Sequence, residues 1–194
     1  HRQEVFFDNN YTSLIDLHSY GHDIETAWLV DRGASVLGDE AYIAKMAPIT
    51  ADLEQNVYKL AYSENSFKNE CERGVDDERR IWWVQAEAVV GFYNGWQKDN
   101  SKTHYLEAAE NIWKFIQDKV VDKRPGSEWF SEVDVNGKPY MHKPILEPWK
   151  CPYHNGRMCL EMIKREKEGN GFIMKEGIYE AMIVNLGQGN GNNW

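Results

Sequence analysis

The stretch IWWVQAEAVVGF, residues 81–92, decides the fold class of this 194-residue chain. It lies in a segment, 78–96, whose apolar residues cover nearly every side of an α-helix. A helix of this kind is buried on more than one side and contacts protein or ligand over most of its surface. We therefore expect an interior helix with other helices packed around it.

Helical periodicity continues on both sides of this segment. Apolar residues recur at helical spacing over 21–37 and 40–62, and over 101–120 they form one stripe opposite charged residues, which is typical of a surface helix. Pro48 predicts a kink, or a division into two shorter helices, within 40–62.

The last third of the chain contains one further helix and a turn signal. Pro152 suits a helix start, so we expect a helix from residue 153 or 154 to 167. Residues 127–140, SEWFSEVDVNGKPY, alternate in polarity and contain Asn136-Gly137, which predicts a small β-hairpin.

Interior helices that alternate with surface helices indicate an all-α fold, an α/α toroid built from helical hairpins. A complete barrel needs about twice as many helices as this chain supplies, so the sequence predicts half of one. We expect residues 1–168 to form this half barrel, and we assign no role to the Gly- and Asn-rich tail, 169–194. Because the chain begins with His1 and not Met, it is expected to be a fragment or a processed chain.

Composition limits the possible partners. The net charge is −9 and no block of Lys or Arg is dense enough to follow a phosphate backbone, which argues against nucleic acid and favours a neutral ligand. No apolar run has the length of a membrane span. Three cysteines favour a reducing, cytoplasmic location. The eight tryptophans fit either a packed core or a carbohydrate cleft.

The first candidate site is GHDIETAW, residues 21–28. His22, Glu25 and Trp28 step round one side of a helix, where a single ligand could touch all three. A histidine both takes and gives a proton near neutral pH, and a carboxylate one turn away can hold its tautomer. The alternative is a histidine at a helix start that its neighbours merely cap.

The second candidate lies in the interior segment itself. Trp83 and Glu87 are four residues apart, which places a flat ring beside a carboxylate, as a sugar site requires, with Trp82 adjacent. The alternative is a pair of core tryptophans with Glu87 paired to Arg79 or Arg80, because a carboxylate in so apolar a helix needs a partner.

The third candidate is WKCPYHNGR, residues 149–157. Cys151, His154 and Cys159 match no common zinc pattern, so we expect no metal site. We expect His154 to stand at the opening of the last helix and to face the same cavity as His22. The alternative is a capped helix start with a histidine whose hydrogen bonds are satisfied within the protein.

These three segments together resemble the N-acetylglucosamine 2-epimerase family in order and approximate separation, over most of residues 1–165. The WWVQAE and PYHNGR segments are similar to the branch of that family that acts on cellobiose. The resemblance implies the C-terminal half of an (α/α)6 barrel, and an isomerase that works without metal or cofactor. That enzyme epimerises C2 of the reducing-end glucose of cellobiose and related β-1,4-linked disaccharides.

The resemblance also implies residue roles. One histidine removes the C2 proton to give a cis-enediol(ate), and a second returns a proton to the opposite face. The residues that match the family's site are His22 and His154 as the acid–base pair, Glu25 as the supporting carboxylate, and Trp28, Trp82, Trp83 and Glu87 as sugar contacts.

The family also uses an arginine and a further histidine from its N-terminal half, and neither has a counterpart here. We therefore expect this chain alone to be an incomplete enzyme whose partners are the remaining N-terminal half and a disaccharide. Two other functions fit the residues: an aldose–ketose isomerase on the same barrel, and a carbohydrate-binding fragment without catalysis.

Overall fold

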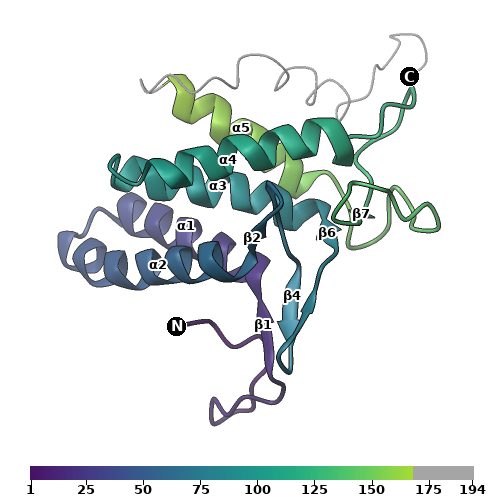
Figure 1. The fold of residues 1–194 in the computed structure, drawn as a ribbon. Helices are drawn as coiled ribbons and strands as arrows, with labels where there is room; N and C mark the ends of the chain where they lie inside the picture. The colour runs from purple at the N-terminus through teal and green to yellow at the C-terminus, as the bar shows by residue number, and fades with distance from the viewer. Residues whose placement is uncertain (168–194) are drawn as a thin grey trace, which may run out of the picture.

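The computed structural model describes residues 1–167 as stacked helical hairpins with short strands gathered toward one end (Figure 1). The first hairpin consists of α1, Tyr20–Leu37, and α2, Glu40–Ala61, and the second of α3, Trp82–Lys98, and α4, Thr103–Phe115. The last helix, α5, Tyr153–Lys167, packs against α3. Because α3 contacts α1, α4 and α5, the helices α1, α3 and α5 form an inner row that α2 and α4 cover from outside.

This arrangement confirms the predicted α/α toroid architecture. No helix within residues 1–167 combines the length and the apolar character needed to cross a membrane. The predicted tail, 169–194, lies outside the described residues.

The interior helix is α3, as its sequence predicts. Every residue from Val84 to Gly95 is buried. Gly91 allows α1 to approach closely, because a Cβ atom at this position would lie 2.7 Å from Cδ1 of Ile24. The core of the molecule therefore centres on α3, and any polar side chain on this helix must find its partners inside the protein.

Two predicted helix bounds differ from the structure. α3 begins at Trp82 because the two residues before it form strand β6, Arg80–Ile81, which pairs with β7, Glu132–Val133. α4 ends at Phe115 and continues as a single π-helical turn, η1, Ile116–Val120.

The predicted division at Pro48 is wrong, because α2 is one helix through this residue. Pro48 lies on the exposed face of α2. Water can therefore satisfy the carbonyl group that loses its N–H partner there, and the missing hydrogen bond does not end the helix.

Short strands connect the beginnings of α1 and α3. Strands β1, Leu17–Ser19, β4, Glu70–Glu72, and β5, Val75–Asp77, form an antiparallel sheet in the order β1-β4-β5. Strands β2, Tyr62–Ser63, and β3, Ser66–Phe67, form a second, two-stranded sheet. The larger sheet holds the residue before α1 against the segment that leads into α3.

The predicted hairpin at 127–140 is present as a tight chain reversal. The amide of Gly137 donates to the carbonyl of Asp134 at 2.9 Å, and a single bridge joins Val133 to Pro139. Gly137 has a φ of +82°, a conformation that glycine adopts without strain. The longer ladder of this segment is the one between β7 and β6.

Candidate functional site

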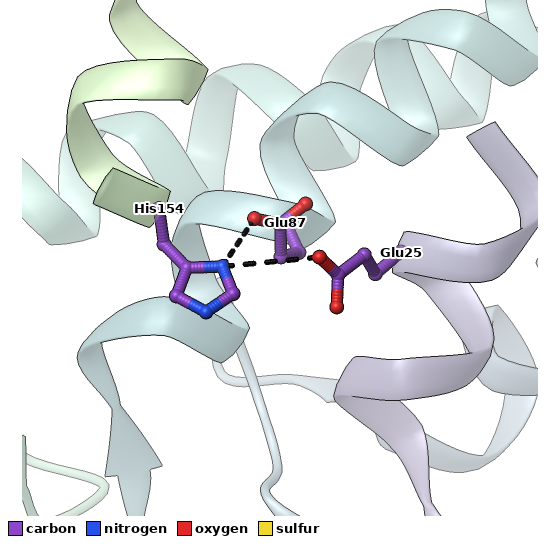
Figure 2. Close-up of side chains that lie close together, drawn as sticks. All are labelled: Glu25, Glu87 and His154. Atoms are coloured by element: carbon purple, nitrogen blue, oxygen red, sulfur yellow. Dashed lines mark hydrogen bonds and ion pairs between the residues drawn. The ribbon is translucent and has the colours of Figure 1, made fainter. Parts of the chain in front are cut away.

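The beginnings of the three inner helices meet at one cluster. Figure 2 shows Glu25 from α1, Glu87 from α3 and His154 from α5 pointing toward one another. Nδ1 of His154 lies 2.7 Å from Oε1 of Glu87 and 4.0 Å from Oε1 of Glu25. Each of the three candidate segments, 21–28, 81–92 and 149–157, therefore contributes one side chain to this cluster.

Glu87 is the centre of this cluster and is 1% exposed. Its Oε2 accepts a hydrogen bond of 2.9 Å from Nε1 of Trp28. Its Oε1 is 2.7 Å from Nη2 of Arg157, in addition to the contact with His154. A buried carboxylate is stable only when donors of this kind replace its lost water.

The alternative partners that the sequence offered for Glu87 are wrong. Arg79 instead binds Asp77 and Glu132, and Arg80 donates through Nε to Ser66. The arginine that holds Glu87 comes from a segment distant in sequence, which local spacing around Glu87 does not indicate.

Sequence reasoning assigned no role to Arg157. It lies three residues after His154, one turn along α5, and that spacing was the available signal. Its guanidinium donates to both Glu25 and Glu87 and lies 5.2 Å from the ring centroid of Trp28. Burial alone would lower the pKa of Arg157, but hydrogen bonds to Glu87 and Glu25 and their charges raise it above its ordinary value.

The same cluster has the donor types of a metal site, since ligand atoms of Glu25, Glu87 and His154 all lie within 4.8 Å of one another. However, Nη2 of Arg157 already contacts Oε1 of both carboxylates. A divalent cation would have to displace a guanidinium from these oxygens, so the donor set does not fit a metal ion.

His22 reaches the site from the first turn of α1 and is exposed. Its ring centroid lies 4.9 Å from that of Trp83, and Trp83 lies 5.2 Å from His154. Gly21 makes this packing possible, because a Cβ atom there would lie 2.6 Å from Cη2 of Trp83. The two predicted histidines therefore contact the same indole, although they come from different helices.

A cavity of about 310 Å³ opens beside this indole. Apolar ring faces and fixed polar groups line it together, which suits a polyhydroxylated ligand. Glu132 forms ion pairs of 2.7 Å with Arg79 and with Lys143 at this surface. The residues that line the cavity include Ser19, His22, Arg79, Trp82, Trp83, Glu132 and Lys143.

The predicted sugar-contacting residues divide into two groups. Trp82 and Trp83 line the cavity. Trp28 is 2% exposed and binds Glu87, so both lie in the supporting cluster and not on the cavity wall. His154 is 6% exposed and packs on Trp83 from that cluster.

Known proteins match this chain over most of the residues that form this site. The model of the N-acylglucosamine 2-epimerase (GlcNAc 2-epimerase) family matches residues 5–156. A cellobiose 2-epimerase from Eubacterium cellulosolvens is 52% identical over 164 residues, which cover 84% of this chain and 40% of that protein.

Solved structures agree with the sequence matches. A sugar epimerase from a ruminal bacterium superimposes with a TM-score of 0.83 and 43% identity, over 88% of this chain and 43% of that one. A cellobiose 2-epimerase from Bacillus thermoamylovorans superimposes with a TM-score of 0.77 and 43% identity, over 84% of this chain and 42% of that one. The chain therefore spans about 40% of the length of the relatives that it matches.

Proposed function

The chain belongs to the N-acylglucosamine 2-epimerase family, and from that premise we propose that it carries one wall of a sugar 2-epimerase site with His22 and His154 as the acid–base pair. The observation that carries this proposal is the packing of both histidine rings on Trp83, at 4.9 and 5.2 Å, from different helices. Inversion at one carbon needs proton transfer on both faces of a planar intermediate. Two histidines on separate helices can supply those two faces.

The proposed substrate is a β-1,4-linked disaccharide such as cellobiose, in the open aldehyde form of its reducing-end sugar. One histidine takes the C2 proton, and the electron pair of that C–H bond moves into a C1–C2 double bond to give a cis-enediol(ate). The other histidine then protonates C2 on the opposite face. The names of the matched epimerases and the mixed apolar and polar lining of the cavity support this choice of substrate.

The surrounding residues have supporting roles in this proposal. Glu87 orients His154 through its bond to Nδ1, and Arg157 joins Glu87 to Glu25 so that neither carboxylate is left without a partner. Trp83 presents a flat ring to the sugar beside His22. Stabilisation of the enediolate oxygen is assigned to an arginine outside this chain, since Arg157 is engaged with two carboxylates.

We further propose that activity requires the N-terminal part of the family's barrel as a partner. The chain covers about 40% of the matched epimerases, so a large share of their cavity walls comes from other residues. Electrostatic stabilisation of the intermediate is usually a major part of catalysis, and this chain alone would lack it.

A cytoplasmic location stays a prediction.

The test is to co-express this chain with the N-terminal part of the Eubacterium cellulosolvens epimerase and to incubate the complex with cellobiose. We expect a disaccharide with mannose at its reducing end. His22→Asn and His154→Asn should abolish this product, whereas His104→Asn, which changes an exposed histidine on α4, should leave it unchanged. A ketose product would indicate an aldose–ketose isomerase, and full activity of either site variant would overturn the assignment of the pair.

A further inference from the structure

The serine at the start of α1 does not cap its helix. Ser19 is the N-cap residue, with φ −84° and ψ 102°, and its side chain makes no capping hydrogen bond. A serine in this position ordinarily accepts a hydrogen bond from the backbone N–H two or three residues later. Ser19 instead places its Oγ 2.7 Å from Nδ1 of His22, the side chain of that third residue.

The partners of this hydroxyl fix where the histidine proton lies. Ser19 is 4% exposed, and within residues 1–167 its Oγ forms a hydrogen bond with His22 alone. If Nδ1 of His22 carried the proton, the hydroxyl would accept, and its own hydrogen would have no protein acceptor within residues 1–167. The hydroxyl therefore donates to Nδ1, and the neutral ring carries its proton on Nε2.

His154 has the reverse arrangement. Its Nδ1 faces Oε1 of Glu87 at 2.7 Å, and an ionised carboxylate only accepts, so Nδ1 carries the proton and Nε2 keeps a lone pair. Nη2 of Arg157 also lies 3.4 Å from Nδ1, but its two hydrogens are donated to the carboxylates of Glu25 and Glu87.

We propose that Ser19 is a positioning residue that holds neutral His22 with its proton on Nε2, in the tautomer opposite to that of His154. His154, with a lone pair on Nε2, can accept the C2 proton as it stands. His22 must take up a second proton, on Nδ1, before its imidazolium can protonate C2, so the two resting rings are not equivalent. This catalytic consequence rests on the proposed function, whereas the tautomer itself does not.

The tautomer is tested on the chain as it exists, labelled with ¹⁵N-histidine and studied by long-range ¹H–¹⁵N NMR at a pH where the rings are neutral. His22→Gln and His154→Gln identify the two sets of resonances. We expect a pyridine-like Nδ1 for His22 and a pyrrole-like Nδ1 for His154. Ser19→Ala should move His22 toward a mixture of tautomers and leave His154 unchanged, and Ser19→Thr should restore the parent spectrum.

A matched control is Ser127→Ala, which removes a serine hydroxyl that donates to Asp122 in another loop and should leave His22 unaffected. A pyrrole-like Nδ1 on His22 in the parent chain, or an identical His22 spectrum in Ser19→Ala, would overturn the proposal.

Activity gives a second readout in the complex with the N-terminal part. Ser19→Ala should lower kcat about tenfold, change KM little and alter the pH dependence of kcat, and Ser19→Thr should recover most of the rate. Equal losses in the Ala and Thr variants would reject the positioning role. If the parent complex itself is inactive, the proposed function fails, and the NMR result still decides the role of Ser19.

Discussion

Glu87 and Glu54 are glutamates with equal burial, 1% exposed each, in two different polar clusters. Glu87 accepts hydrogen bonds from Trp28 and Arg157 and contacts His154. In Glu54, the buried atom Oε1 has no hydrogen-bond partner within residues 1–167, and the nearest cation, Nζ of Lys98, is 3.6 Å away. Burial accordingly raises the pKa of Glu54 to about 7.

The difference shows what distinguishes a built site from a buried acid. Removal of a carboxylate from water costs free energy in both places. At Glu87 three side chains from α1 and α5 offset that cost, and their arrangement orients His154. At Glu54 the cost is only partly offset. Its effect is therefore to make the stability of the fold depend on pH, and it orients no catalytic side chain.

The largest effect should come from breaking the Glu87 cluster. Glu87→Gln removes the charge that holds the proton of His154 on Nδ1 and leaves Arg157 with Glu25 alone. We expect the epimerase activity of the co-expressed complex to fall roughly a thousandfold, the loss typical of a disrupted acid–base group. Steady-state kinetics with cellobiose measures this fall. Glu54→Gln is the matched control and should keep full activity, and equal losses in both variants would remove the distinction between the two clusters.

The second effect concerns stability at the other cluster. Because the folded pKa of Glu54 is raised above its unfolded value of 4.5, the folded state binds the extra proton, and stability falls as pH rises from about 4.5 to 7. The shift corresponds to a loss of roughly 3 kcal/mol in unfolding free energy above pH 7, relative to its value below pH 4.5. Urea unfolding between pH 5 and pH 8 should show this slope in the parent chain, and Glu54→Gln should flatten it.

Glu107→Gln, a change at an exposed glutamate on α4, serves as the control and should keep the parent slope. An unchanged pH dependence in Glu54→Gln would show that Glu54 carries no such penalty.

A smaller effect should come from the packing beside the site. Gly21→Ala would place a methyl group 2.6 Å from Cη2 of Trp83 and 2.9 Å from Cγ2 of Val84. We expect a loss of about 2 kcal/mol in unfolding free energy, as for other overpacked cores. Gly33→Ala, on the exposed side of the same helix with open space around it, should instead stabilise the chain by about 0.5 to 1 kcal/mol. Thermal denaturation of both variants checks the difference, and a loss from Gly33→Ala as large as that from Gly21→Ala would contradict it.

Much of the fold could be predicted because helical periodicity is local. The bounds of α1 and α2 agree with the predicted ranges to within one residue, and the all-round apolar pattern of 81–92 identifies the interior helix correctly. The strands β1, β4 and β5 were missed because each has three residues and pairs with a segment distant in sequence, as Ser19 does with Glu70. Such pairing leaves no period in a short stretch.

The site could be predicted only in part for the same reason. His22, Trp83 and His154 were predicted as site residues from their own segments and from the resemblance, and the structure brings their rings together. Arg157 was given no role because its two partners lie 132 and 70 residues away. Ser19 was missed because a serine at a helix start is normally a cap, and nothing local indicates that it binds a side chain instead.

The most direct test of the central claim, proton transfer at C2 by His22 and His154, is to follow cellobiose in deuterium oxide with the co-expressed complex by NMR. The account predicts deuterium at C2 of the mannose-containing product, and no mannose-containing product with His22→Asn or His154→Asn. Epimer formation without deuterium at C2, or epimer formation that persists in either variant, would contradict it.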